Sequence, residues 1–190
     1  GPGRLEAFSD GVIAIIITIM VLEMKVPHGE GLSALAELWP VFLSYVLSFI
    51  YVGIYWNNHH HLLHTVKRVN GRIMWANMSL LFWLSLFPFC TGWMGENHFA
   101  EAPVAVYGAV LLAAAISYTI LLVAIRQSHG SDHRFERAIG SDFKGKLSMA
   151  LYVLGIVLAH WQPIAGFLCY CAVAVIWFIP DRRIENSLAD

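Results

Sequence analysis

The sequence predicts an all-α, polytopic membrane protein with six transmembrane helices. Of its 190 residues, 58% are hydrophobic and only 13% are charged, whereas soluble domains carry about 25% charged residues. A soluble domain of this length has too little interior to bury so many apolar side chains. Because a membrane-spanning helix needs about 20 residues, six spans and their connections would occupy residues 1–190 as one domain.

The first two spans follow from long apolar runs near the N-terminus. We predict the first over about residues 5–25, because residues 11–22 include no charged side chain. The second is predicted over about 37–61, with Pro40 in its first turn. Proline is tolerated there because the first backbone N–H groups of a helix have no partner within the helix.

The remaining four spans follow in the same way. The third is predicted over about 72–93, with a kink at Pro88, since proline removes one backbone hydrogen bond from a helix interior. The others are predicted over about 103–125, 143–161 and 163–179.

The basic residues predict the orientation of the spans. Only Lys25 falls on one side of the predicted membrane, and the other eleven Lys and Arg residues fall on the opposite side. Those eleven are Arg4, Lys67, Arg68, Arg72, Arg126, Arg134, Arg137, Lys144, Lys146, Arg182 and Arg183. Since cytoplasmic loops carry an excess of Lys and Arg, both termini are expected to be cytoplasmic.

The opposite side is acidic. It carries Glu23, Glu30, Glu37, Glu96 and Glu101. These carboxylates either solvate the loops or concentrate cations near the mouth of a conduction path.

Polar residues precede the apolar run of the first span. Arg4 stands just before the predicted span, and Ser9 and Asp10 follow Phe8 in its first turns. An ionisable residue at the edge of the hydrocarbon layer is costly unless it is paired or hydrated. Asp10 is therefore either part of a hydrogen-bonded hub that fixes helix packing or a direct contact for ions.

Four histidines, His59, His60, His61 and His64, cluster at the end of the second span and just beyond it. His60 and His64 share a helix face, at a spacing that suits zinc. No cysteine or carboxylate stands beside them in the sequence, and no His-Glu-x-x-His pattern is present. We therefore predict no metal site and no cofactor.

The motifs in the first three spans resemble those of a known family. Arg4-x-x-x-Phe8-Ser9-Asp10 begins the first span, Trp56-x-x-His59-His60 closes the second, and Asn77 lies in the third. The chain is thereby similar to the lysosomal potassium channels of the transmembrane protein 175 family, whose bacterial members are single six-helix chains. The resemblance covers the last three spans only in their hydropathy.

The resemblance implies a homotetramer in the bacterial inner membrane with a central pore lined by the first helix. The family's apolar constriction corresponds to Ile15, Ile19 and Leu22, and its pore threonine to Thr18. Potassium is the expected permeant ion. The resemblance also implies a structural polar network of Arg4, Phe8, Ser9, Asp10, Trp56, His59, His60 and Asn77.

The residues alone leave other interpretations of the first helix open. Ile15, Ile19 and Leu22 recur at i, i+4 and i+7, which places them on one face of a helix. Such a stripe can also face lipid or pack against a neighbouring helix. Thr18 can also donate a hydrogen bond back to the carbonyl of Ala14.

The main alternative function is a proton- or metal-coupled transporter that uses Asp10 and the His59–His64 cluster. Transporters often contain repeated halves with broken helices. The sequence has no symmetrical counterpart of Pro88 in a second half, which disfavours a transporter. An enzyme is not expected, because no nucleophile–base motif is present. No nucleic-acid partner is expected either, since the basic loops are explained by topology.

Overall fold

The computed structural model describes residues 1–129 and 143–178, and within these ranges the chain forms only helices. The helices are α1 (Pro2–Leu22), α2 (Leu32–Ala36), α3 (Trp39–His64), α4 (Gly71–Ser85), α5 (Phe87–Glu96), α6 (Glu101–His129), α8 (Phe143–Ala159) and α9 (Pro163–Phe178). The all-α fold class predicted from the sequence is thereby confirmed for the described residues.

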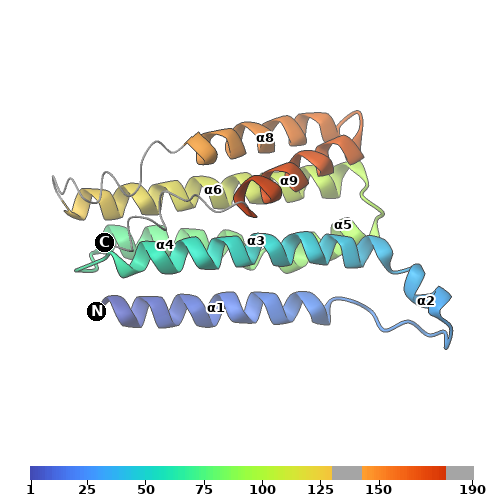
Figure 1. Ribbon diagram of the computed structural model, residues 1–190, viewed down its shortest axis with the longest axis horizontal. Helices are drawn as coiled ribbons and strands as arrows, with labels where there is room; N and C mark the ends of the chain where they lie inside the picture. Colours follow the sequence, from blue (N-terminus) through green and yellow to red (C-terminus); the bar gives the residue numbers. More distant parts are fainter. Residues whose placement is uncertain (130–142, 179–190) are drawn as a thin grey trace.

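The long helices lie side by side as a bundle (Figure 1), with α1 along one edge. A middle layer of α3, α4 and α5 separates α1 from α6, α8 and α9. The helix ends alternate between the two ends of the bundle. The start of α1 and the α3–α4 connection lie at one end, and α2 and the α8–α9 turn lie at the other.

Four segments are long and apolar enough to cross a membrane. They are Pro2–Leu22, Trp39–His64, Gly71–Glu96 (α4 together with α5) and Glu101–Ser128. Helices α8 and α9 have 17 and 16 residues, which at 1.5 Å per residue is about 25 Å, slightly less than a hydrocarbon layer of about 30 Å. The count of six spans therefore stays a prediction.

The third predicted span is divided in two. Helix α4 ends at Ser85 and α5 begins at Phe87, with Leu86 between them. Pro88 lacks an N–H group and cannot donate to the carbonyl four residues earlier. A kink was predicted at Pro88, and the break between the two helices lies two residues before it.

Other boundaries differ modestly from the prediction. Helix α3 continues through His64, so the whole histidine cluster is helical, and the short helix α2 was not predicted from the sequence. Several predicted features lie outside the described residues: Ile179, the end of the sixth span, and the basic residues Arg134, Arg137, Arg182 and Arg183.

Helices α8 and α9 approach closely because glycines face each other between them. A Cβ atom at Gly166 would lie 2.5 Å from the carbonyl oxygen of Gly155, and one at Gly155 would lie 2.4 Å from Tyr170 Cε1. Tyr170 also accepts a hydrogen bond at its backbone oxygen from Tyr51 Oη of α3, at 2.6 Å. Small residues thus join α8 to α9, and a buried hydroxyl joins this pair to the middle layer.

Candidate functional site

Helix α1 has one buried face and one uncovered face. Ser9, Ile13, Ile16 and Met20 are buried and recur at the three- and four-residue spacing of a single helix face. This face packs on α3, α4 and α5. The other face of α1 has no covering helix in the described part of the chain.

A buried chain of hydrogen bonds starts from Ser9. The Ser9 hydroxyl donates to Leu5 O at 2.8 Å and accepts from Asn77 Nδ2 at 2.9 Å. Asn77 Oδ1 lies 2.6 Å from His59 Nε2. All three polar side chains are fully buried, so these bonds link α1, α4 and α3 in the protein interior, where lost partners are costly.

The amide of Asn77 determines the tautomer of His59. Because Asn77 Nδ2 donates to Ser9, Asn77 Oδ1 faces His59 and can only accept a hydrogen bond. The proton of His59 therefore resides on Nε2, and Nδ1 carries the lone pair. Nδ1 is buried and has no hydrogen-bond partner among the described residues.

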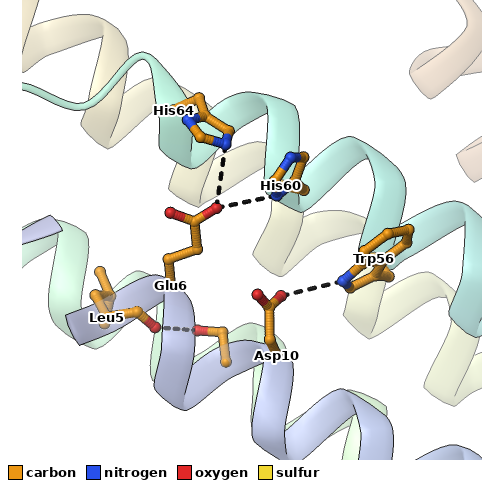
Figure 2. Close-up of polar contacts among 7 residues, drawn as sticks. Leu5, Glu6, Asp10, Trp56, His60 and His64 are labelled. Atoms are coloured by element: carbon orange, nitrogen blue, oxygen red, sulfur yellow. Dashed lines mark hydrogen bonds and ion pairs between the residues drawn. The ribbon is translucent and has the colours of Figure 1, made fainter. Parts of the chain in front are cut away.

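A second set of polar contacts runs along the outer side of the α1–α3 interface (Figure 2). Trp56 Nε1 donates to Asp10 Oδ1 at 3.1 Å. One helical turn further along, Glu6 Oε1 lies 2.9 Å from His60 Nδ1 and 3.4 Å from His64 Nε2. The contacts form a ladder because the two helices are antiparallel, and each contributes side chains four residues apart.

The structure brings together most residues of the polar network implied by the resemblance. Ser9, Asn77 and His59 form the buried chain, whereas Asp10, Trp56 and His60 belong to the ladder. Phe8 is exposed. Arg4 is exposed too, and its backbone nitrogen donates to Gly1 O.

Sequence reasoning missed the contribution of Glu6. This carboxylate is distant from the histidines in sequence, yet it lies against His60 and His64 in the fold. The signal that identifies it is its spacing, since Glu6 precedes Asp10 by four residues and therefore shares its helix face.

The uncovered face of α1 carries the four proposed pore residues. Ile15 is 57% exposed and Leu22 is 79% exposed, and Ile19 and Thr18 are also exposed. The Thr18 hydroxyl lies 2.9 Å from Ile15 O and 3.2 Å from Ala14 O, so it donates back to its own helix. A groove between α1 and α5 borders this face, with Ile15, Ile19, Phe89 and Trp93 in its walls.

At the other end of α1, the single basic residue among the glutamates is paired. Lys25 Nζ lies 2.8 Å from Glu96 Oε1, and the hydrogen bond and negative charge of Glu96 raise the pKa of Lys25. Glu23 and Glu37 line the same depression beside this pair. The positive charge of Lys25 is thereby offset locally, and this end of the bundle is acidic.

The long apolar helices, with a buried polar anchor and an uncovered stripe on α1, are the features of an integral membrane protein of the channel class. The model of the endosomal/lysosomal potassium channel TMEM175 family matches residues 4–88, which include the Ser9–Asn77–His59 chain. A potassium channel from Chryseobacterium sp. (strain P1-3) is 57% identical over 188 residues, which cover 99% of this chain and 98% of that protein.

The three-dimensional comparison agrees. The crystal structure of a lysosomal potassium-selective channel TMEM175 homolog from Chamaesiphon minutus matches with a TM-score of 0.79 and 30% identity, covering 94% of this chain and 96% of the other. The endosomal/lysosomal proton channel TMEM175 of Gallus gallus is 30% identical over 156 residues, which cover 73% of this chain and 31% of that protein. This chain belongs to the TMEM175 family, as a bacterial member.

Family membership decides between the function classes left open by the sequence. The chain is an ion channel and an integral membrane protein, since its family and relatives are membrane channels. Membership thus favours a channel over the coupled transporter, and the same relatives are channels rather than enzymes.

Proposed function

We propose that the chain forms a homotetrameric, potassium-preferring cation channel of the bacterial inner membrane, with six spans per chain and both termini cytoplasmic. The observation that carries the proposal is the two-sided character of α1. Its buried face is anchored to the bundle through Ser9, and its opposite face leaves Ile15, Thr18 and Leu22 uncovered.

Several copies of the chain are needed to use that uncovered face as a conduction path. One helix cannot enclose a pore, but copies arranged around a symmetry axis can. The apolar groove between α1 and α5 gives the neighbouring subunit's α1 a surface to pack against. Its walls include Phe89 and Trp93, large side chains that favour burial.

Rings of Ile15, Ile19 and Leu22 would constrict the pore. Apolar constrictions close channels by excluding water, so ions cannot pass without losing their hydration shells. The tetramer would therefore be closed wherever these rings are narrow, and opening would require α1 to move outward or rotate.

Thr18 is the proposed source of the potassium preference. Its hydroxyl proton is directed to the backbone carbonyls of Ile15 and Ala14, which leaves oxygen lone pairs free on the uncovered face. Four such oxygens could replace part of the hydration shell of an ion. The acidic residues at the other end of α1 would raise the local cation concentration.

The polar network serves as the anchor of the pore helix. In this proposal Ser9, Asn77 and His59 hold the first half of α1 against α3 and α4, and Asp10, Trp56 and His60 fix its lateral position. Arg4 and Phe8, exposed in the single chain, would complete the network at the contact with an adjacent subunit.

The test is ion flux in proteoliposomes that contain the purified protein. We expect potential-driven potassium flux that exceeds sodium flux, without accompanying proton flux. Thr18→Ala should lower the potassium-to-sodium permeability ratio by about two- to tenfold, the equivalent of about 0.5–1.5 kcal/mol for one lost polar contact.

Thr119→Ala is the matched control, because Thr119 also donates back to its helix, to Ala115 O at 2.9 Å, but lies on α6. Its permeability ratio should equal that of the wild type. An unchanged ratio in Thr18→Ala would remove Thr18 from selectivity. Current carried by protons rather than potassium would contradict the proposed potassium preference.

A further inference from the structure

Glu6, His60 and His64 bring three potential metal ligands together at one end of the α1–α3 interface (Figure 2). One ligand atom from each side chain lies within 4.8 Å of the others. Glu6 is on α1 and both histidines are on α3, one helical turn apart. The cluster therefore lies across the α1–α3 interface, where only noncovalent contacts hold the two helices together.

The distances between the ligand atoms suit a tetrahedral ion. Glu6 Oε1 lies 2.9 Å from His60 Nδ1 and 3.4 Å from His64 Nε2. Around a zinc ion, with bonds of about 2.1 Å, ligand atoms at tetrahedral angles lie about 3.4 Å apart. Small side-chain rotations would therefore suffice to place all three atoms around one ion.

The hydrogen bonding of His60 leaves a ligand atom available. Its Nδ1 is buried, and although it lies near Glu6 it has no hydrogen-bond partner among the described residues. Trp56 stacks on the His60 ring, with centroids 5.8 Å apart and planes 23° apart. The ring is thus held in place with its buried Nδ1 beside the Glu6 carboxylate.

The site is open on one side. The His64 side chain is 61% exposed, whereas that of Glu6 is 20% exposed, so an ion could enter from solvent and keep water as its fourth ligand. Three protein ligands with one open position are typical of accessible rather than structural zinc sites. Two imidazoles favour zinc and similar transition metals over magnesium or calcium.

We propose that Glu6, His60 and His64 form a binding site for a divalent transition-metal ion of the zinc class that clamps α1 to α3. A bound ion would add a link beside the Asp10–Trp56 hydrogen bond and restrict movement of α1. This second consequence rests on the proposed function, in which α1 lines the pore, and predicts that the metal reduces ion flux.

Binding is measured by titrating zinc chloride into the full-length, tag-free protein in detergent, using isothermal titration calorimetry. We expect one zinc ion per chain in the wild type, and no binding of magnesium or calcium under the same conditions. Glu6→Gln and His64→Ala should each weaken binding by at least tenfold, since metal-ligand losses cost at least as much as the 10- to 100-fold typical of outer-shell partners.

His61→Ala is the matched control, because His61 is exposed and adjacent in sequence but is not one of the three ligands. It should bind zinc like the wild type. His64→Gln, a milder change, replaces His64→Ala if the alanine variant fails to elute as a folded protein. Equal zinc affinity in the wild type, Glu6→Gln and the His64 variant would overturn the site, as would no binding to the wild type.

Flux measurements separate the site from its proposed effect. Zinc that inhibits flux in the wild type and in His61→Ala, but not in Glu6→Gln, would support the clamp. Zinc binding without inhibition of a measurable potassium flux would overturn the clamp and leave the site. Zinc binding to a protein that conducts no potassium would contradict the proposed function instead.

Discussion

Asn77 satisfies two buried partners at once. Its amide nitrogen donates to Ser9 Oγ and its amide oxygen accepts from His59 Nε2, at 2.9 and 2.6 Å. Three helices thereby meet at one side chain. Asn77 is the member of these bonds that contacts both Ser9 on α1 and His59 on α3. Neither Ser9 nor His59 can therefore replace it.

We expect Asn77→Ala to destabilise the protein by about 2–4 kcal/mol, since it removes the donor to Ser9 Oγ and leaves the buried His59 Nε2 without an acceptor. The measurement is thermal unfolding in detergent, followed by the fluorescence of the tryptophans. Asn57→Ala on α3 is the control, because Asn57 is exposed and should change the unfolding temperature little. Similar unfolding temperatures for the two variants would show that the buried chain adds no stability.

The candidate site could be predicted in part from the sequence. Ser9, His59 and Asn77 were grouped through motif resemblance, and the structure places them in contact. Glu6 was not grouped with the histidines, because contacts between distant segments depend on how two helices face each other. Neither the spacing of the histidines nor the charge of Glu6 contains that information.

At the level of helices, the closest packing in the described bundle involves glycine. The α8–α9 pair meets through Gly155 and Gly166, whose backbones approach to distances that exclude a Cβ atom. Lipid provides no hydrophobic driving force between helices, so small residues and close van der Waals contact hold such pairs together.

Gly166→Ala should therefore separate α8 from α9. Its new Cβ would lie 2.5 Å from Gly155 O and 3.1 Å from Ala159 Cβ, and such overpacking costs about 1–3 kcal/mol. The unfolding temperature measured by circular dichroism should fall. Gly53→Ala in α3 has no atom within 4 Å of its new Cβ and should be neutral or slightly stabilising; an equal effect of both substitutions would contradict the packing argument.

The helix boundaries in the structure differ from those of the predicted spans by up to four residues, as at the end of α6, which lies at His129 rather than at residue 125. A kink at Pro88, close to the junction of α4 and α5, was expected because proline has a local and general effect on helices. Helix α2 was not expected, since its five residues are too few for a hydrophobic period to be recognised.

At the level of the whole molecule, the uncovered stripe of α1 has its proposed role only in an assembly. A single Ile15 presents one side chain, whereas four copies would form a closed apolar ring. The stripe was predicted from spacing, but spacing alone did not separate a pore from a lipid-facing surface. The family resemblance favoured the pore, because side chains of similar hydropathy suit a lipid-facing surface and a dry constriction.

We expect Ile15→Asn to increase basal potassium flux about tenfold or more. Each copy of the chain loses one isoleucine side chain, which removes about 1.5–3 kcal/mol of hydrophobic free energy. A change of about 1.4 kcal/mol in the barrier corresponds to a factor of ten in flux. Flux is measured in proteoliposomes, and native mass spectrometry checks that the variant and the wild type assemble with the same number of chains.

Ile164→Asn provides the comparison, because Ile164 is similarly exposed, at 51%, but lies in the first turn of α9. Its flux should match that of the wild type. If Ile15→Asn conducts no more than Ile164→Asn, the constriction does not lie at Ile15.

The buried chain at Ser9 also has a consequence for biosynthesis. Ser9 is translated 68 residues before Asn77, which at about 5–20 residues per second is a delay of about 3–14 s. During that interval Ser9 lacks its hydrogen-bond partner on α4. The Ser9 hydroxyl donates to Leu5 O within α1 itself, so its proton is satisfied before α4 exists. Asn77, whose described side-chain bonds are to His59 and Ser9, is translated only after both of these residues.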